Sequence, residues 1–189
     1  ETRVATVKSL GQTRLDTEGL AFAPDGTLYG MDDDALTLFA LNPDNAVVQS
    51  GSELLIQGPP TGGGNDFGMT FACDGSLYVT SSATGSLYRM DLQGKATLIG
   101  AAGSLNPVKI SALAAWGNPV QLYGLGNGAD AAGNPATPNL YQINPATGTA
   151  TLIGALGPAA GRYLQGGLAF DDAGQLWAIT EGAQFGWDS

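Results

Sequence analysis

The chain has 189 residues, of which 29 are Gly and 10 are Pro, while 43% are hydrophobic. This composition predicts many turns around a packed core and argues against a disordered chain. The net charge of −10, with only 7 basic residues, makes nucleic acid and anionic membrane surfaces poor partners, and no apolar run is long enough for membrane insertion.

The chain contains no His and a single Cys, Cys73. Catalytic triads, imidazole general bases and ordinary zinc sites are therefore excluded, and an enzyme would have to use carboxylates, Lys, Tyr or a hard metal ion. We interpret Cys73, beside a predicted turn, as a structural residue, because no base is available to activate it. The first residues of this sequence do not have the pattern of a signal peptide, and we interpret Glu1 as the start of a processed or trimmed chain.

An eleven-residue pattern recurs along the chain. It ends in Leu-Tyr or Leu-Trp, and the Leu stands at positions 28, 77, 122 and 176, so that successive copies are 49, 45 and 54 residues apart. The copies are Gly19–Tyr29, Gly68–Tyr78, the weaker Ala112–Tyr123 and Gly167–Trp177. Two further elements repeat behind this pattern, one beginning at Leu38, Leu87 and Leu140 and the other reading Ala-Thr-Leu-Ile-Gly-Ala at 96–101 and 150–155.

Each repeat therefore contains four short β-rich segments. Asp25-Gly26 and Asp74-Gly75 predict tight turns with positive φ, and Asn144–Gly148 predicts a type I turn that ends in a left-handed Gly. No stretch of ten residues has a 3.6-residue apolar period, so we expect almost no helix.

Four antiparallel strands every 45 to 54 residues predict an all-β fold, a β-propeller of about four four-stranded blades, incomplete or closed by a second copy. We expect one domain, residues 1–189, with repeats at about 12–60, 61–104, 105–160 and 161–189 and a separate strand at 3–10. A β-sandwich is the alternative, but it predicts no such period. Packing between blades is expected from Leu20, Phe22, Leu28, Leu38 and their equivalents.

The two ends of the sequence allow two interpretations of how the ring closes. The strand at 3–10 resembles the fourth strand of a blade, and the C-terminal repeat has only two strands unless Gln184–Trp187 supplies another. The chain is then either a minimal four-blade ring or part of a larger propeller whose other blades are missing or come from a second copy. Because open blade edges favour pairing, we expect self-association, with Phe185 and Trp187 covering an edge or a partner.

These repeats resemble those of NHL/TolB-like and SMP-30-like β-propellers. They are most similar to those of secreted bacterial proteins whose blades carry the pattern LYxIDPxTG, here Leu140–Gly148. The resemblance covers nearly the whole chain, but its motifs concern the fold far more than the activity. It implies either an extracellular binding or adhesion module or a metal-dependent lactonase or esterase.

The lactonase branch of the resemblance implies a divalent metal in the central channel, bound by a Glu directly before an early Gly. Glu18 fits this position, whereas its equivalents Phe67, Ser111 and Gly166 do not offer a carboxylate or amide. Asn65 and Asp66 would complete the site only if their loop is reshaped. The alternative is that these three are solvated loop residues.

Asp32-Asp33-Asp34 supplies the hard oxygen ligands that Ca²⁺ prefers, and in a strand only Asp32 and Asp34 point to the same face. The alternative is a hydrated acidic loop. Arg162 and Tyr163 precede the last blade and are candidates for the channel mouth, where they would suit a carboxylate or a sugar. The insertion at 126–138 is either a binding loop or an inert flap.

The sequence thus predicts a secreted or cell-surface module for binding or assembly, non-enzymatic, with a protein or carbohydrate ligand. The alternative is a metal-dependent hydrolase with its site at the central channel. The expected ligand-binding residues are Glu18, Asn65, Asp66, Arg162 and Tyr163, and the expected metal ligands are Glu18, Asp32 and Asp34. The cofactor is either none or a divalent metal ion such as Ca²⁺.

Overall fold

The structure is a computed structural model, and it describes residues 8–13, 16–59, 65–129, 135–157, 160 and 166–180. Its regular elements are fourteen β-strands. None of the described segments forms a helix with the length and apolar character needed to cross a membrane.

The strands form four antiparallel sheets, which we call blades 1 to 4, and within each sheet the strands follow one another in chain order. Blade 1 contains β1 (Gly19–Phe22), β2 (Leu28–Asp32), β3 (Thr37–Leu41) and β4 (Leu54–Leu55). Blade 2 contains β5 (Phe67–Phe71), β6 (Leu77–Ser81), β7 (Ser86–Met90) and β8 (Ala96–Ile99). Blade 3 contains β9 (Lys109–Trp116), β10 (Gln121–Ala129), β11 (Pro135–Ile143) and β12 (Ala150–Ala155), and blade 4 contains β13 (Gly166–Phe170) and β14 (Leu176–Thr180).

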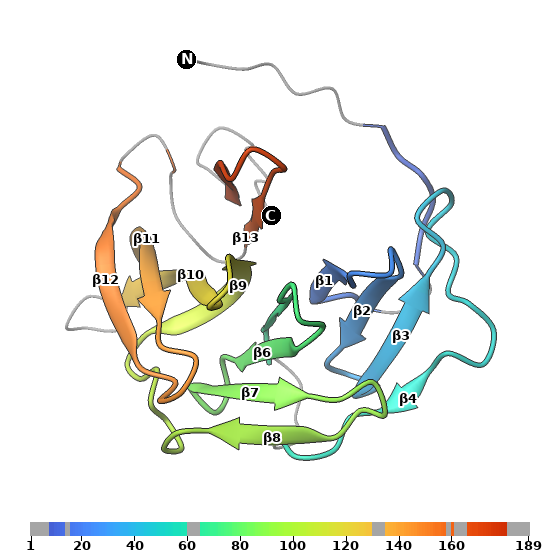
Figure 1. Cartoon of the computed structure of the whole chain (residues 1–189), viewed down its shortest axis with the longest axis horizontal. Helices are drawn as coiled ribbons and strands as arrows, with labels where there is room; N and C mark the ends of the chain where they lie inside the picture. Colours follow the sequence, from blue (N-terminus) through green and yellow to red (C-terminus); the bar gives the residue numbers. More distant parts are fainter. Residues whose placement is uncertain are drawn as a thin grey trace.

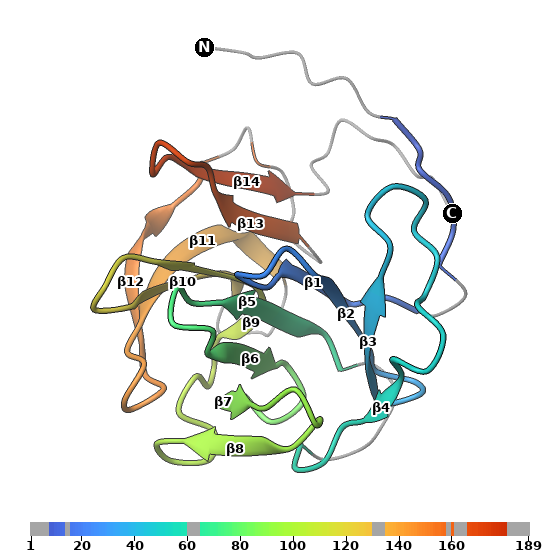
Figure 2. The same cartoon turned by 45° about the vertical axis from the view of Figure 1, so that its right-hand side comes forward.

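The blades are arranged about a common centre, with β4, β8 and β12 at the periphery (Figure 1). The first strands of successive blades pack against each other in the order β1, β5, β9 and β13, as the turned view also shows (Figure 2). Among the described residues no comparable packing joins β13 back to β1. The fold is therefore an incomplete β-propeller of about four blades, which confirms the predicted fold class.

Both proposed end strands lie wholly or partly outside the described residues. Residues 184–187 are not described, and of the strand expected at 3–10 only residues 8–10 are, which are not in a strand. Blade 4 accordingly has two strands in the described part of the chain.

The tight turns form where the sequence predicts them. Gly26 and Gly75 have φ values of 85° and 82°, and Gly148 has a φ of 68°. The Asp that precedes Gly26 accepts a hydrogen bond from the backbone N–H of Thr27 at 2.9 Å. This local bond and the left-handed Gly together close the hairpin.

The core lies between blades, and it contains most of the predicted packing residues. Leu38 is fully buried, and Leu28 is almost so. The prediction for Leu20 and Phe22 is wrong, because these side chains are 54% and 58% exposed. Both point away from blade 2, and no described blade covers the other side of β1.

Candidate functional site

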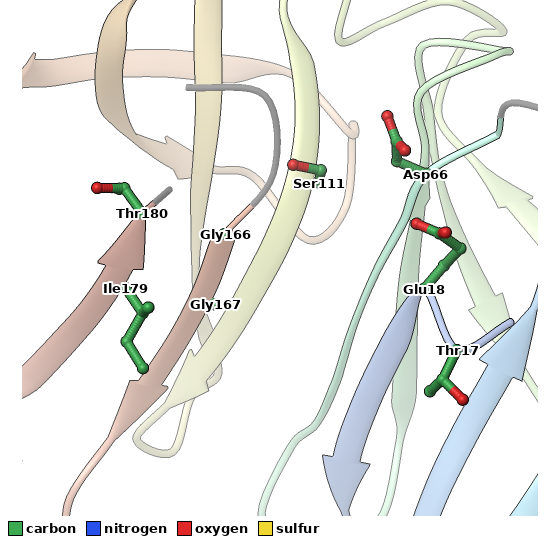
Figure 3. A pocket seen from close by; sticks show the side chains of 8 residues that line it. All are labelled: Thr17, Glu18, Asp66, Ser111, Gly166, Gly167, Ile179 and Thr180. Carbon is green, nitrogen blue, oxygen red and sulfur yellow. The ribbon is translucent and has the colours of Figure 1, made fainter. Parts of the chain in front are cut away.

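The candidate site lies at one end of the central channel, where the chain enters the first strands of the blades. A cavity of about 310 Å³ opens there between blade 4 and blades 1 to 3. Glu18 and Asp66 lie next to each other on one side of it, and Ser111 and the β13–β14 hairpin lie opposite (Figure 3). The described lining contains no Lys or Arg; it consists of Thr17, Glu18, Asp66, Ser111, Gly166, Gly167, Ile179 and Thr180.

Backbone hydrogen bonds place the two acidic residues at this mouth. The N–H of Glu18 donates to the carbonyl oxygen of Met31 at 2.9 Å, which extends the β1–β2 ladder by one residue. The N–H of Asp66 donates to the hydroxyl oxygen of Ser82 at 2.9 Å, and the carbonyl oxygen of Asp66 accepts from the N–H of Ser82 at 3.0 Å. Both carboxylates are therefore carried by the rigid ends of strands.

Three carboxylates converge behind Glu18. Oxygens of Asp16, Glu18 and Asp33 all lie within 4.8 Å of one another. Asp33 is buried and Asp16 is exposed, so the cluster runs from the interior of the loop to the solvent. Such a set of oxygen donors suits a hard divalent cation.

The pKa of Glu18 is raised from 4.5 to about 7. Burial is the largest cause, because it disfavours the charged form, and the negative charges of Asp66, Asp33, Asp16 and Asp32 add to it in that order. Glu18 thus exchanges its proton near neutral pH, unlike an ordinary glutamate.

The acidic run Asp32-Asp33-Asp34, which begins with the last residue of β2, has divided roles. Asp32 is buried and holds the loop, since its two carboxylate oxygens accept from the N–H groups of Ala35 at 2.7 Å and Asp16 at 3.1 Å. Asp33 points into the carboxylate cluster, and Asp34 is exposed and lies outside it. Of the metal ligands expected from the sequence, the structure therefore places Glu18 in the cluster and Asp32 beneath it.

Asn65 is completely buried and lies behind the mouth rather than in its lining. Its side-chain oxygen accepts hydrogen bonds from the hydroxyl of Ser81 at 2.8 Å and from the N–H of Ala83 at 3.1 Å. Its backbone N–H donates to the carboxylate of Asp33 at 3.0 Å. These bonds make Asn65 a support for the acidic loop.

Some of the residues predicted from the sequence are not described by the structure, and two residues of the cluster were not predicted. Arg162 and Tyr163 lie outside the described residues, as does the middle of the insertion at 126–138. Sequence reasoning missed Asp16 and Asp33 as partners of Glu18. A signal for Asp16 was present in its position two residues before Glu18, but nothing local shows that Asp33 turns back toward both.

No protein-family profile and no curated protein matches the sequence. Solved structures do match. Virginiamycin B lyase from Staphylococcus aureus is 17% identical with a TM-score of 0.50, and the alignment covers 85% of this chain and 47% of the lyase. Myxococcus xanthus glutaminyl cyclase is 23% identical with a TM-score of 0.55, and the alignment covers 87% of this chain and 67% of the cyclase.

A protein of unknown function from Bacteroides thetaiotaomicron is 11% identical with a TM-score of 0.58, over 90% of this chain and 47% of that protein. The chain thus spans less than half the length of the lyase and of the Bacteroides protein. These similar structures are β-propeller proteins, and at such identities they support the fold alone. The finer resemblance to NHL/TolB-like or SMP-30-like repeats stays a prediction.

Proposed function

We propose that this protein is a non-enzymatic binding module whose channel mouth binds a divalent cation, with Ca²⁺ preferred. The observation that carries the proposal is the convergence of Asp16, Glu18 and Asp33 oxygens within 4.8 Å. Two oxygens on one Ca²⁺, each at 2.3–2.6 Å, can be at most about 5 Å apart. One ion can therefore contact all three carboxylates with little rearrangement.

Electrostatics supports a cationic ligand. Asp66 adds a further carboxylate beside Glu18, and the described lining of the cavity has no basic side chain to balance these charges. Their mutual repulsion contributes to the raised pKa of Glu18. A bound divalent cation would remove this repulsion and would displace the proton from Glu18.

The open cavity next to the cluster leaves room for a second ligand group. A protein or carbohydrate oxygen entering this space of about 310 Å³ would complete the coordination of the ion. A secreted or cell-surface location is part of the proposal, and it rests on the resemblance of the repeats to those of secreted bacterial proteins.

Isothermal titration calorimetry with CaCl₂ at pH 7.5 tests the proposal. The wild-type protein should bind one equivalent, and Glu18→Gln and Asp33→Asn should each weaken binding at least about tenfold. Asp34→Asn is the matched control, because it removes a neighbouring charge outside the cluster. Absence of binding by the wild-type protein, or an equal loss in Asp34→Asn, would overturn the proposal.

The hydrolase alternative is favoured by one observation, the Glu18 pKa of about 7 in a cavity that Ser111 also lines. A carboxyl group with this pKa can act as a general acid or base at neutral pH. The alternative is tested with lactone and ester substrates in the presence of Ca²⁺, Mg²⁺, Mn²⁺ or Zn²⁺. If the wild-type protein hydrolyses a substrate and Glu18→Gln abolishes this activity, the protein is a hydrolase. If the protein binds metal but hydrolyses none of the substrates, the binding-module proposal stands.

A further inference from the structure

The central channel contains a second cavity, of about 150 Å³, next to the one at its mouth. We call this second space the inner cavity and the cavity of about 310 Å³ the mouth cavity. Glu18, Ser111, Gly166 and Gly167 line both, so the two spaces adjoin. The first strands of all four blades contribute to the walls of the inner cavity.

The two cavities differ in their chemistry. Carboxylates and hydroxyls dominate the mouth cavity, and they come from Thr17, Glu18, Asp66, Ser111 and Thr180. Apart from the shared Glu18 and Ser111, the described lining of the inner cavity is apolar. Its large side chains are Leu20, Phe67, Met69, Leu113 and Leu168. The channel therefore changes from acidic and polar at its mouth to apolar inside.

The inner cavity has fixed walls and room for an apolar group. Phe67, Met69 and Leu113 are all buried, so the packing between blades holds them in place. A Cβ atom at Gly167 would meet no atom within 4 Å, whereas one at Gly19 would be 3.0 Å from the Met69 Cγ. The small residue at 167 therefore borders open space. An apolar cavity of about 150 Å³ can hold benzene, so a group of about six carbons fits here.

The charge at the mouth selects the polar end of a ligand. Glu18 and Asp66 lie next to each other there (Figure 3), and Asp16 and Asp33 lie close to Glu18. The described lining of both cavities contains no Lys or Arg. An anionic ligand is therefore repelled and an organic cation is attracted. A single divalent cation would neutralise only two of these four carboxylates, so the preference for positive charge persists when one is bound.

We propose that the channel binds a small organic monocation, whose ammonium group lies at Glu18 and Asp66 and whose apolar group enters the inner cavity. Hydroxyl oxygens at the mouth can accept hydrogen bonds from the ammonium group. The apolar group covers part of Leu20, which is 54% exposed and lines the inner cavity. Each end of such a ligand thus meets the chemistry that suits it, as in small-molecule sites that combine apolar walls with a few polar groups.

This site goes beyond the proposed Ca²⁺ site and uses other residues. The ion is assigned to Asp16, Glu18 and Asp33, and neither Asp16 nor Asp33 lines either cavity. The organic cation instead depends on Asp66 and on the space beside Gly167. Glu18 belongs to both sites, so substitutions at Asp66 and Gly167 are the ones that separate them.

An NMR titration with benzylamine hydrochloride, in metal-free buffer at pH 7.5, tests the proposal. Benzylammonium combines a positive charge with a benzene ring, and three further probes each change one of these features. Benzyl alcohol lacks the charge, benzoate reverses it, and methylammonium lacks the ring. One equivalent of benzylammonium should bind, and it should bind at least about tenfold more tightly than each of the other three probes.

Two substitutions test the two ends of the ligand separately. Asp66→Asn removes a charge at the mouth, and Gly167→Leu places a side chain in the open space of the channel. Each should weaken benzylammonium binding at least about tenfold, with the far-UV circular dichroism unchanged. Asp34→Asn is the matched control, because Asp34 is exposed and lines neither cavity, and its affinity should equal that of wild type.

Three outcomes would overturn the proposal. They are absence of benzylammonium binding by wild type, equal binding of benzoate or methylammonium, and equal weakening by Asp66→Asn and Asp34→Asn. Asp33→Asn distinguishes this site from the Ca²⁺ site, because it should lose Ca²⁺ binding while it still binds benzylammonium. If wild type binds Ca²⁺ but not benzylammonium, this proposal alone fails and the Ca²⁺ site stands.

Discussion

The backbone N–H of Asn65 donates a hydrogen bond to the carboxylate of Asp33, 3.0 Å away and 32 residues earlier in the chain. This bond joins the loop before blade 2 to the acidic loop of blade 1. Through its side chain Asn65 is also bonded to Ser81 and Ala83, so one residue ties the acidic cluster to the β6–β7 turn. The position of Asp33 beside Glu18 thus depends on contacts between blades.

Asn65→Ala should destabilise the fold by about 1–3 kcal/mol, because it leaves the buried hydroxyl of Ser81 without its acceptor and opens a small cavity. Urea unfolding measures this change. The control is Asn45→Ala, whose side chain is exposed and accepts one bond from the N–H of Val47; it should cost about 0.5 kcal/mol or less. Equal effects of the two substitutions would refute the supporting role of Asn65.

The titration of Glu18 should have its midpoint near pH 7, and Asp66→Asn should lower it because one negative charge is removed. The pKa should remain above 4.5 in that variant, since burial is the larger cause. Carbon-13 NMR of the Glu18 carboxyl measures both values, with Asp25→Asn in the distant β1–β2 turn as control. A wild-type midpoint near 4.5 would contradict the account. Ca²⁺ affinity should rise with pH through this midpoint and level off above it, where the proton no longer competes for Glu18.

The same group predicts how stability depends on pH. The pKa of Glu18 is higher in the folded protein than its ordinary 4.5, so between pH 4.5 and 7 the folded state binds more protons than the unfolded state. The Glu18 contribution is therefore complete below pH 4.5, falls as pH rises to about 7 and is constant above it. Glu18→Gln should flatten the decline in that window, measured as Tm against pH without added metal. An unchanged profile in Glu18→Gln would mean that other groups cause the decline.

Thr80→Val should destabilise the contact between blades 2 and 3. The buried hydroxyl of Thr80 donates to the carbonyl oxygen of Ile110 at 2.9 Å and accepts from the N–H of Gly68 at 3.2 Å. Valine keeps the shape but leaves these backbone groups unsatisfied, at a cost of about 1–3 kcal/mol. Thr149→Val, at an exposed position, serves as control in the same denaturant titration, and its midpoint should stay within error of wild type. If Thr80→Val unfolds no more readily than Thr149→Val, the hydroxyl contributes nothing to the interface.

Local chemistry made the blades predictable. Asp25-Gly26 and Asp74-Gly75 specify their turns within a few residues, and the recurring Leu-Tyr strands specify which segments pair. Glu18 was identifiable too, because it directly precedes the repeat, and Ser111 and Gly166, its counterparts in the repeat, do line the same cavity.

The sequence by itself determined the repeat, the turns and the antiparallel strand order of each blade, since these depend on neighbouring residues and on alternating side chains. Only the tertiary structure decided that Asp16, Glu18 and Asp33 converge, that Asn65 supports them from behind, and that Leu20 and Phe22 are exposed while Met69 and Phe71 are packed. The physical reason is that these relationships depend on how separate blades are oriented against each other. That orientation is set by packing between residues far apart in the chain, which a repeated local pattern does not encode.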